Sequence, residues 1–259
     1  MKISILITNY NKLNYLKKSL KYVLKQNFKN YEVIVFDDLS TDKSVDYIKK
    51  IKKIKLIINK KNKIKSEPLL NQNNAIMKAF KASKGEIICL MDADDIFFKN
   101  KLLHINNFFQ KNKKKNFVLN YPANQKILLN KKTNNKVFKK WSYIFPTSCI
   151  SFRRNFFKKF IKFSRFKEFK DLGIDARLII FAEYYLNDHN IIRKKLNTYT
   201  VNKEGNYSKY KHLGLNWWKS RNEAFEYLKY ILKLKNIKFK KTTDYYLTKL
   251  INIIINRTL

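Results

Sequence analysis

The amino-acid sequence predicts an α/β fold, in which a mostly parallel sheet is flanked by helices and followed by a helical C-terminal extension. Short apolar runs alternate with helical patterns through the first hundred residues. These runs are continuous, as is typical of strands that are buried on both faces. Strand–helix–strand units in this order take right-handed crossovers, which make their strands parallel.

The first half supplies four strands with a helix after each. Leucines and a valine recur at three- and four-residue spacing over residues 13–23, which predicts an amphipathic helix after the first strand. The helix after the second strand has Ser40 or Thr41 as its expected N-cap. The expected strands are 3–7, 31–36, 55–58 and 86–91, and the later helices are 71–82 and 101–110.

The second half is less regular, and it contains no internal repeat. Several short strand-like pieces occur between residues 117 and 152, with a hairpin loop expected at 130–135. The chain becomes helical after Gly205. The expected elements beyond the hairpin are a helix at 171–186, a strand at 197–201, and helices at 216–232 and 244–255.

The composition indicates a large core under a strongly basic surface. The 259 residues are 45% hydrophobic, enough for one large domain or a domain with an appendage. Lys+Arg number 57 against 19 Asp+Glu, a formal net charge of +38. This charge suggests nucleic acid, an anionic membrane surface or a phosphorylated substrate as a partner. An AT-rich coding bias that fills exposed positions with lysine explains the same composition.

Cysteine usage and hydropathy bear on location. Cys89 and Cys149 lie in apolar contexts without CxxC spacing, so buried thiols in a reducing cytoplasm are expected. The N-terminus has too short an apolar stretch for a signal peptide, and no window approaches the roughly 20 apolar residues of a membrane span. We therefore expect a soluble cytoplasmic protein whose basic surface can contact the inner face of a membrane.

Polar residues gather where the predicted strands end. They follow the first, second and fourth strands, at 8–11, 37–38 and 92–95. The ligand site of an open parallel sheet lies outside the carboxyl ends of its strands, so these three segments should line one site. Helix capping would explain Asp38 or Ser40 singly, but it does not explain the group.

The sequence "DADD" at 92–95 places three carboxylates together in a chain that is poor in acids. Carboxylates taken out of water cost several kcal/mol each unless partners offset the charge. Mg²⁺ or Mn²⁺ would offset it, because these hard cations take oxygen ligands, including substrate phosphates. A solvated acidic loop is the alternative. With no glycine-rich phosphate loop in the chain, the metal itself would neutralise a bound diphosphate.

Three segments together resemble the family 2 glycosyltransferases, which are nucleotide-sugar-dependent enzymes with the GT-A fold. They are "SILITNYNKLNYLKKSLKYVLKQNF", "YEVIVFDDLSTDKS" and "ASKGEIICLMDADDIFFKNKL". The resemblance covers residues 1–105 well and the remainder loosely. It implies a GT-A domain over 1–204, with a nucleotide-sugar-binding half at 1–110 and an acceptor-binding half at 111–204. Residues 205–259 would be the C-terminal helical extension.

The resemblance also assigns roles. Thr8 and Tyr10 match residues that hold the nucleotide, and Asp38 matches the acid that binds base or ribose. Asp92 and Asp94 match the DxD motif that holds Mn²⁺ or Mg²⁺ on the diphosphate, with Asp95 beside it. The nucleotide-sugar site is therefore expected to contain Thr8, Tyr10, Asn11, Asp37, Asp38, Asp92, Ala93 and Asp94, and the metal site Asp92, Asp94 and Asp95.

Members of the family that invert the sugar use a further carboxylate to deprotonate the acceptor hydroxyl. Asp175 in "GIDARL" lies where that acid is usual, and Asp171 is the second candidate. An acid in the first turn of a helix is also stabilising by itself. Trp217, Trp218 and Arg221 resemble the acceptor segment of some members, although they also suit a helix with an aromatic face.

Three departures from the family pattern stand out. Thr8 stands where the family often has Pro, and Leu39 stands where Gly follows the paired acids, which leaves the tight turn there open. Ile174 replaces the acid that usually precedes the catalytic one. The implied partners are a nucleotide-sugar donor, a glycan or lipid-linked acceptor and an anionic membrane surface. The donor sugar, the acceptor and the oligomeric state cannot be inferred from the sequence.

Other functions fit less well. A phosphotransferase whose nucleophile lies in DxD would carry it after the first strand, followed by Thr or Val, whereas Ile96 follows the fourth strand here. A nucleotidyltransferase would begin with a glycine- and arginine-rich loop, unlike "TNYNK". A nucleic-acid-binding protein fits the charge, but the chain has no recognisable binding module, and no specific nucleic acid is expected.

Overall fold

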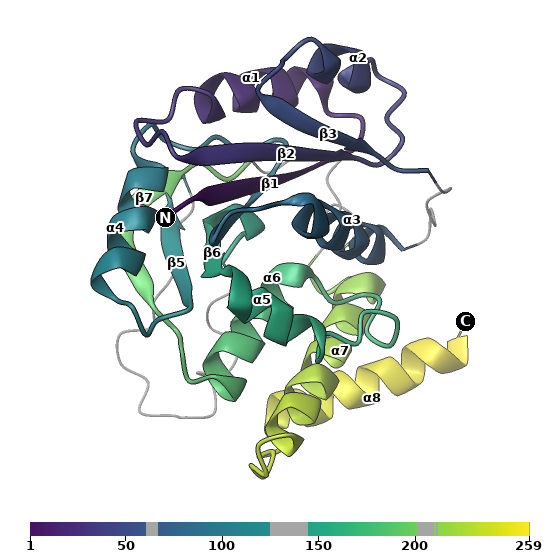
Figure 1. The fold of residues 1–259 in the computed structure, drawn as a ribbon. Coiled ribbons are helices and arrows are strands. Elements are labelled where there is room, and N and C mark those ends of the chain that lie inside the picture. The colour runs from purple at the N-terminus through teal and green to yellow at the C-terminus, as the bar shows by residue number, and fades with distance from the viewer. Residues whose placement is uncertain (61–66, 125–144, 201–209, 211, 259) are drawn as a thin grey trace.

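The computed structural model describes residues 1–60, 67–124, 145–200, 210 and 212–258. The expected hairpin loop at 130–135 lies outside these residues, as do the boundaries at 204 and 205. Within them the chain forms one seven-stranded sheet with helices on both faces (Figure 1). The predicted α/β class and mostly parallel sheet are therefore confirmed.

The sheet has the strand order β3-β2-β1-β4-β6-β5-β7. Strands β1 to β4 are parallel, β6 is antiparallel to both β4 and β5, and β7 is parallel to β5. The four parallel strands are the four that the sequence predicted. The strands are β1 Ile3–Asn9, β2 Tyr31–Asp37, β3 Ile54–Ile58, β4 Ile87–Asp92, β5 Phe117–Pro122, β6 Ile150–Arg153 and β7 Ile191–Asn197.

Two hydrophobic cores lie on the two faces of the sheet. On one face, strand residues such as Ile5 pack against α1, α2 and α4. On the other face, the intervening strand residues, such as Leu6, pack against α3, α5, α6 and α7. This alternation follows from the two-residue period of a strand. The helices are α1 Leu13–Val23, α2 Ser44–Lys49, α3 Pro68–Ala82, α4 Lys101–Lys111, α5 Arg154–Ile161, α6 Ile174–Ile180, α7 Leu215–Lys233 and α8 Thr243–Thr258.

Two elements of the second half differ from the predictions. The expected helix at 171–186 begins only at Ile174, after the extended Gly173, and continues beyond Ile180 as a π-helical turn, Phe181–Tyr185. The strand expected at 197–201 is wrong, because β7 ends at Asn197 and its exposed charged residues 193–195 mask the strand pattern.

The N-cap prediction for α2 is also wrong. The helix begins at Ser44, whose N–H donates to Asp42 Oδ1 at 3.1 Å. The other oxygen of this carboxylate accepts the N–H of Leu13, in the first turn of α1, at 2.7 Å. Asp42 thus serves two helix N-termini, while Ser40 is used elsewhere.

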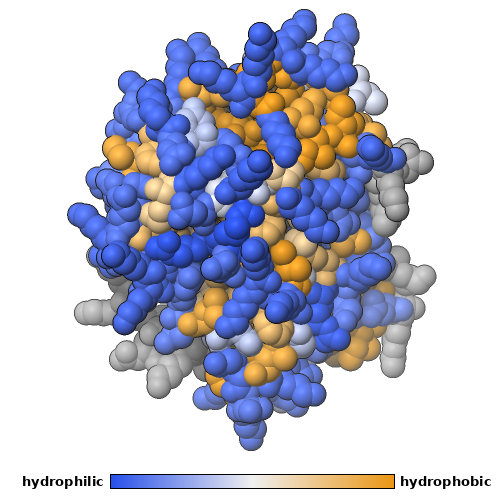
Figure 2. Space-filling model, in the orientation of Figure 1, coloured by the Kyte–Doolittle hydropathy of each residue, from blue (hydrophilic) through white to orange (hydrophobic). Residues whose placement is uncertain are grey.

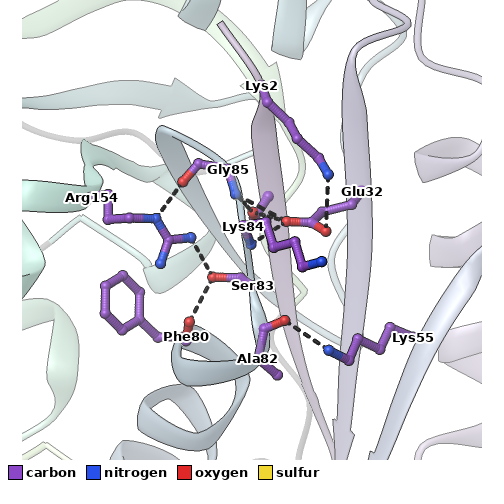
Figure 3. Close-up of polar contacts among 10 residues, drawn as sticks. Lys2, Glu32, Lys55, Phe80, Ala82, Ser83, Lys84, Gly85 and Arg154 are labelled. Atoms are coloured by element: carbon purple, nitrogen blue, oxygen red, sulfur yellow. Dashed lines mark hydrogen bonds and ion pairs between the residues drawn. The ribbon is translucent and has the colours of Figure 1, made fainter.

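The turn between α3 and β4 is fixed at the amino edge of the sheet (Figure 3). Glu32 accepts hydrogen bonds from Ser4 Oγ and from the N–H groups of Lys84 and Gly85. A Cβ on Gly85 would lie 2.4 Å from Ser4 Oγ and 2.5 Å from Ser4 N. Only glycine therefore fits this approach of the turn to β1.

The C-terminal helices form a hairpin on the outer side of α6. In Figure 1, α8 runs along the outer side of α7, at the edge of the molecule farthest from α1 and α2. Arg221 of α7 pairs with Asp244 of α8. In the described part of the chain, no helix has the length and apolarity to span a bilayer.

Candidate functional site

The carboxyl ends of β1, β2 and β4 lie side by side, as predicted. Thr8 is paired in register with Asp92 of β4, and the next residue, Asn9, is paired with Asp37 of β2. This juxtaposition brings the three polar segments of the sequence to one edge of the sheet. The site is built outward from these strand ends.

Asp37 holds the loops together from within. Its carboxylate is fully buried and accepts hydrogen bonds from Asn9 Nδ2 at 2.7 Å and from the N–H and Oγ of Ser40 at 2.8 and 2.7 Å. Ser40 Oγ accepts in turn the N–H of Asn11 at 2.9 Å. The geometry gives Asp37 a supporting position, and its predicted direct contact with a nucleotide sugar stays a prediction.

The loop after β1 carries the residues expected to meet the nucleotide. Asn11 adopts a left-handed conformation with φ 48°, and its Oδ1 accepts the N–H of Thr41 at 2.7 Å. Tyr10 is 45% exposed at the same edge, and Thr8 is partly buried at the end of β1. The ring of Tyr10 is therefore open to a ligand.

Asp38 is held by Asn59, which is held in turn by Lys78; the sequence analysis singled out neither residue. Asn59, just after β3, donates from Nδ2 to Asp38 Oδ1 at 2.6 Å, and Lys78 of α3 donates to Asn59 Oδ1 at 2.8 Å. Leu39 has φ 61°, so it adopts the left-handed conformation of the glycine that is usual in the family. The tight turn is kept at a cost of roughly 1–2 kcal/mol.

The acidic sequence 92–95 forms a turn that is closed by the N–H of Asp95 and the carbonyl of Asp92 at 3.1 Å. Ser19 of α1 donates a shared hydrogen bond to the carbonyls of Ala93 and Asp95, at 2.6 and 2.8 Å. Ala93 is buried, so it contributes shape to the turn. The turn is anchored from below by α1.

The charged form of Asp92 is disfavoured in the turn, whereas Asp94 has a cationic partner. Burial, followed by the charges of Asp95 and Asp94, raises the pKa of Asp92 to about 8. Gln72 Nε2 donates to Asp92 Oδ1 at 2.8 Å, and the ammonium of Lys12 pairs with Asp94 Oδ2. Burial is the largest cause of this rise, so Asp92 holds its proton near neutral pH unless a cation binds beside it.

Asp95 is engaged by the segment after β7. Its Oδ1 accepts the N–H of Thr200 at 2.7 Å, while Thr200 Oγ1 donates to the carbonyl of Asp94 at 2.6 Å. Burial raises the pKa of Asp95 to about 6. This carboxylate is 1% exposed, and its predicted place in a metal site stays a prediction.

The donor set suits a hard cation that also binds a ligand. Among the described residues, no three His, Cys, Asp or Glu side chains are arranged to hold a metal by themselves. Mg²⁺ commonly takes one or two carboxylates and completes its shell with phosphate and water. Asp92 and Asp94, two carboxylates at the carboxyl end of β4, fit Mn²⁺ or Mg²⁺ in this way.

A buried lysine lies beneath the acidic turn. Lys101 Nζ donates to Asn120 Oδ1, the carbonyl of Ser148 and Asn197 Oδ1, at 2.7, 2.6 and 3.0 Å. Ser148 Oγ accepts the N–H of Asp92 at 3.0 Å. Burial lowers the pKa of Lys101 to about 8. The network ties the turn to β5, β7 and the loop before β6.

The two candidate bases lie in different surroundings. Asp175, 3% exposed in the first turn of α6, is near enough for its charge to raise the pKa of Asp92. Asp171 instead accepts from Tyr210 Oη at 2.8 Å, and its N–H donates to Glu223 at 2.7 Å. Of the two, only Asp175 contributes to the raised pKa of Asp92, while Asp171 is engaged by Tyr210 and Glu223.

The candidate acceptor residues lie at the start of α7. Trp217 and Trp218 pack edge to face at 4.7 Å between ring centroids, and Arg221 lies 5.0 Å above the Trp217 ring. Arg221 also pairs with Asp244 of α8. These contacts join α7 to α8, and a role in acceptor binding stays a prediction.

Sequence reasoning missed several supporting residues. Asn59, Gln72 and Thr200 are polar residues that follow no motif, and only the fold brings them to the strand ends. Lys12 was hidden among many lysines. Tyr199 was also missed, although all four carboxylates, Asp92, Asp94, Asp95 and Asp175, contribute after burial to raising its pKa to about 12.

Comparison with known proteins identifies the family. A family model described as glycosyl transferase family 2 matches residues 4–181. The chain belongs to this family. The match covers every strand that ends at the candidate site and reaches Asp175.

Relatives of this family 2 chain are glycosyltransferases by name. An uncharacterized glycosyltransferase of Rickettsia bellii is 38% identical over 128 residues, which are 49% of this chain and 17% of that protein. The UDP-Glc:α-D-GlcNAc-diphosphoundecaprenol β-1,3-glucosyltransferase WfaP of Escherichia coli is 33% identical over 111 residues, 43% of this chain and 42% of that protein. The chain thus spans less than half the length of either relative.

Solved structures confirm the GT-A fold. S. aureus TarS 1–349 in complex with UDP-GlcNAc aligns with a TM-score of 0.64 at 18% identity, over 94% of this chain and 69% of that one. The mannosyltransferase PcManGT of Pyrobaculum calidifontis, in complex with GDP-Man and Mn²⁺, aligns with a TM-score of 0.59 at 14% identity, over 94% and 66%. At such low identity the likeness concerns the fold alone.

Proposed function

We propose that this family 2 chain transfers a sugar from a nucleotide-sugar donor to an acceptor hydroxyl. The observation that carries the proposal is the juxtaposition of the carboxyl ends of β1, β2 and β4, and the charge of Asp175 contributes, after burial, to raising the pKa of Asp92 there. One edge of the sheet then holds both a place for a diphosphate and a carboxylate for the acceptor. TarS and PcManGT, which share the fold, are named with bound UDP-GlcNAc and GDP-Man.

The donor would lie across the carboxyl ends of β1, β2 and β4. Asp38, held by Asn59, would accept hydrogen bonds from the base or ribose, and Tyr10 would pack against a ring. Thr8 and Asn11 would complete the nucleotide site, with Asp37 and Ala93 supporting the loops. Asp92 and Asp94 would hold Mn²⁺ or Mg²⁺, which when bound acts as a Lewis acid that offsets charge on the diphosphate.

Asp175 would serve as the general base in an inverting displacement. The acceptor oxygen bonds to the anomeric carbon while the bond from that carbon to the diphosphate oxygen breaks, and the electron pair of that bond goes to the diphosphate. The acceptor proton passes to Asp175, a contribution of typically ~10²–10⁴-fold in rate. The carboxylate is buried beside the site, where it can be held against the acceptor hydroxyl.

The acceptor is inferred from a relative and the location from the cysteines. WfaP is named for a diphosphoundecaprenol acceptor, and a lipid-linked or glycan acceptor in cell-surface polysaccharide synthesis is proposed for this chain as well. Trp217, Trp218 and Arg221 would contact that acceptor. The free, buried thiols of Cys89 and Cys149 suit a reducing compartment, so we place the chain in the cytoplasm at the inner face of the membrane.

The test is metal-dependent turnover across UDP-, GDP-, dTDP- and CMP-sugars. Asp94→Ala should abolish Mn²⁺-dependent donor hydrolysis or transfer, because it removes one of the two proposed ligands. Asp46→Ala is the matched control, since Asp46 is an exposed acid on α2. Full activity in Asp94→Ala would refute the assignment. A phosphotransferase or a nucleic-acid-binding protein would not show dependence on a nucleotide sugar.

A further inference from the structure

The outer face of α8 is apolar and exposed. Leu250 is 57% exposed, and apolar residues spaced one helical turn from it lie on the same face. The members of this face are Tyr246, Leu247, Leu250, Ile253 and Ile254, each between 50% and 57% exposed. In Figure 2, hydrophobic surface is visible at the lower right, where α8 runs along the edge of the molecule in Figure 1.

The inner face of α8 is mixed, because Tyr245 and Ile255 are buried there beside two polar residues. Thr248 is fully buried and Asn252 is 7% exposed, and Asn252 Nδ2 donates to the carbonyl of Trp218 at 3.0 Å. A helix that packs on a protein and faces water keeps most of its large apolar residues on the inner face. In α8 the larger number of them lies on the outer face, which suits contact with a surface other than water.

Positive charge surrounds this apolar face. Residues 233–256 contain six lysines and a single acid, Asp244, which is already paired with Arg221. Five of these lysines, 233, 235, 238, 240 and 241, are exposed in the connection from α7 to α8. Leu234 and Ile237 lie among them, 39% and 49% exposed.

The apolar face of α8 and the lysines beside it together distinguish between the partners that could bind there. A second copy of the chain would bring two sets of lysines together, which is electrostatically unfavourable. An anionic lipid surface offers apolar acyl chains below and negative headgroups above. Each basic residue near such a surface adds attraction, and an amphipathic helix lies in its plane.

We propose that α8 and its connection to α7 form a binding surface for an anionic membrane. Leu247, Leu250 and Ile254 enter the boundary between headgroups and acyl chains, and the lysines of 233–241 contact the headgroups. This inference concerns α8 and its connection to α7, which contain no residue of the acidic turn. It is tested without donor or acceptor, so its failure would leave the proposed sugar transfer untouched.

The experiment is co-sedimentation of the chain with vesicles of phosphatidylcholine alone and of phosphatidylcholine mixed with phosphatidylglycerol. The chain should sediment with the anionic vesicles and stay in the supernatant with the neutral ones. Added salt should weaken the binding to anionic vesicles. Leu250→Glu/Ile254→Glu should lower the partition coefficient at least about tenfold, since two large apolar side chains lose their burial. Lys238→Gln/Lys240→Gln/Lys241→Gln should lower it by about fivefold per lysine.

A control is Leu103→Glu, compared with the single variant Leu250→Glu, because it places the same charge at a leucine of α4 that is 38% exposed. It should bind as the unaltered chain does, and circular dichroism should show all variants folded. Absence of binding to anionic vesicles would overturn the proposal. So would equal binding by Leu250→Glu/Ile254→Glu, or a dimer in sedimentation that this double variant abolishes.

Discussion

The backbone N–H of Thr200 donates to Oδ1 of Asp95 over 2.7 Å, across 105 positions of the chain. Thr200 Oγ1 adds a second bond, to the carbonyl of Asp94 at 2.6 Å. The segment after β7 therefore fixes the acidic turn in addition to Ser19. The geometry of the proposed cation ligands depends on this segment as well as on β4.

Thr200→Val should lower turnover about tenfold with a small loss of stability. The substitution keeps the shape and the backbone donor but leaves the carbonyl of Asp94 without its hydroxyl partner, a cost of roughly 1–3 kcal/mol if the group is buried. Initial rates at saturating donor and thermal unfolding measure the two effects. Thr200→Ser restores the hydroxyl and is the control. Equal kinetic constants in the two variants would show that the bond does not position the turn.

Asp175→Asn should separate catalysis from helix capping. Asparagine retains an oxygen that can accept the N–H of Ala176, as Asp175 Oδ1 does at 2.8 Å, but it cannot take a proton from the acceptor. Turnover should therefore fall by ~10²–10⁴-fold while donor affinity and stability stay nearly unchanged. Steady-state kinetics and donor titration supply the comparison. A variant with near-normal turnover would leave Asp175 as a capping residue only.

Gly85→Ala should destabilise the fold by about 1–3 kcal/mol, as is usual when a side chain is forced into a packed site. The added Cβ meets Ser4 N at 2.5 Å and Ile3 C at 2.9 Å, and neither backbone atom can move aside easily. Denaturant unfolding measures the loss. Adding Ser4→Ala to Gly85→Ala removes the contact with the Ser4 hydroxyl but keeps the backbone contacts, so the double variant should not regain stability. A stable Gly85→Ala variant would mean that the α3–β4 turn relaxes freely.

Glu223 should make stability pH-dependent. Burial, and then the charge of Asp171, raises the pKa of Glu223 from 4.5 to about 7. The folded state therefore holds this proton more tightly than the unfolded state does, so the stabilisation is complete below about pH 4.5 and is lost as pH rises through 7. Unfolding of Glu223→Gln and the unaltered chain should diverge in that window, with the variant more stable at pH 8. Parallel pH curves would contradict the raised pKa.

Much of the fold could be predicted because strands buried on both faces give uninterrupted apolar runs. The parallel topology then placed Asp38 and Asp92 at the same edge of the sheet, where the carboxyl ends of its strands lie. β7 escaped prediction because three charged residues, 193–195, face solvent within it. The left-handed Leu39 could not be foreseen, since the surrounding loop and not the residue type imposes that conformation.

Within the site, the acids were predictable and their partners were not. Clustered carboxylates stand out in a chain with 57 Lys+Arg. Asn59 and Gln72 carry no such signal, because amides occur throughout the chain and only the fold selects these two. The same limit applies to Asp37, whose burial beneath Ser40 distinguishes it from the neighbouring Asp38.

The most direct test is calorimetric titration of UDP and GDP into the chain and into Asp94→Asn, each with Mn²⁺ and with a chelator. If Asp92 and Asp94 hold a cation that binds a diphosphate, one nucleotide should bind the unaltered chain only with Mn²⁺, and the variant should lose that binding. Equal binding in the presence of chelator, or undiminished Mn²⁺-dependent binding by Asp94→Asn, would contradict the account.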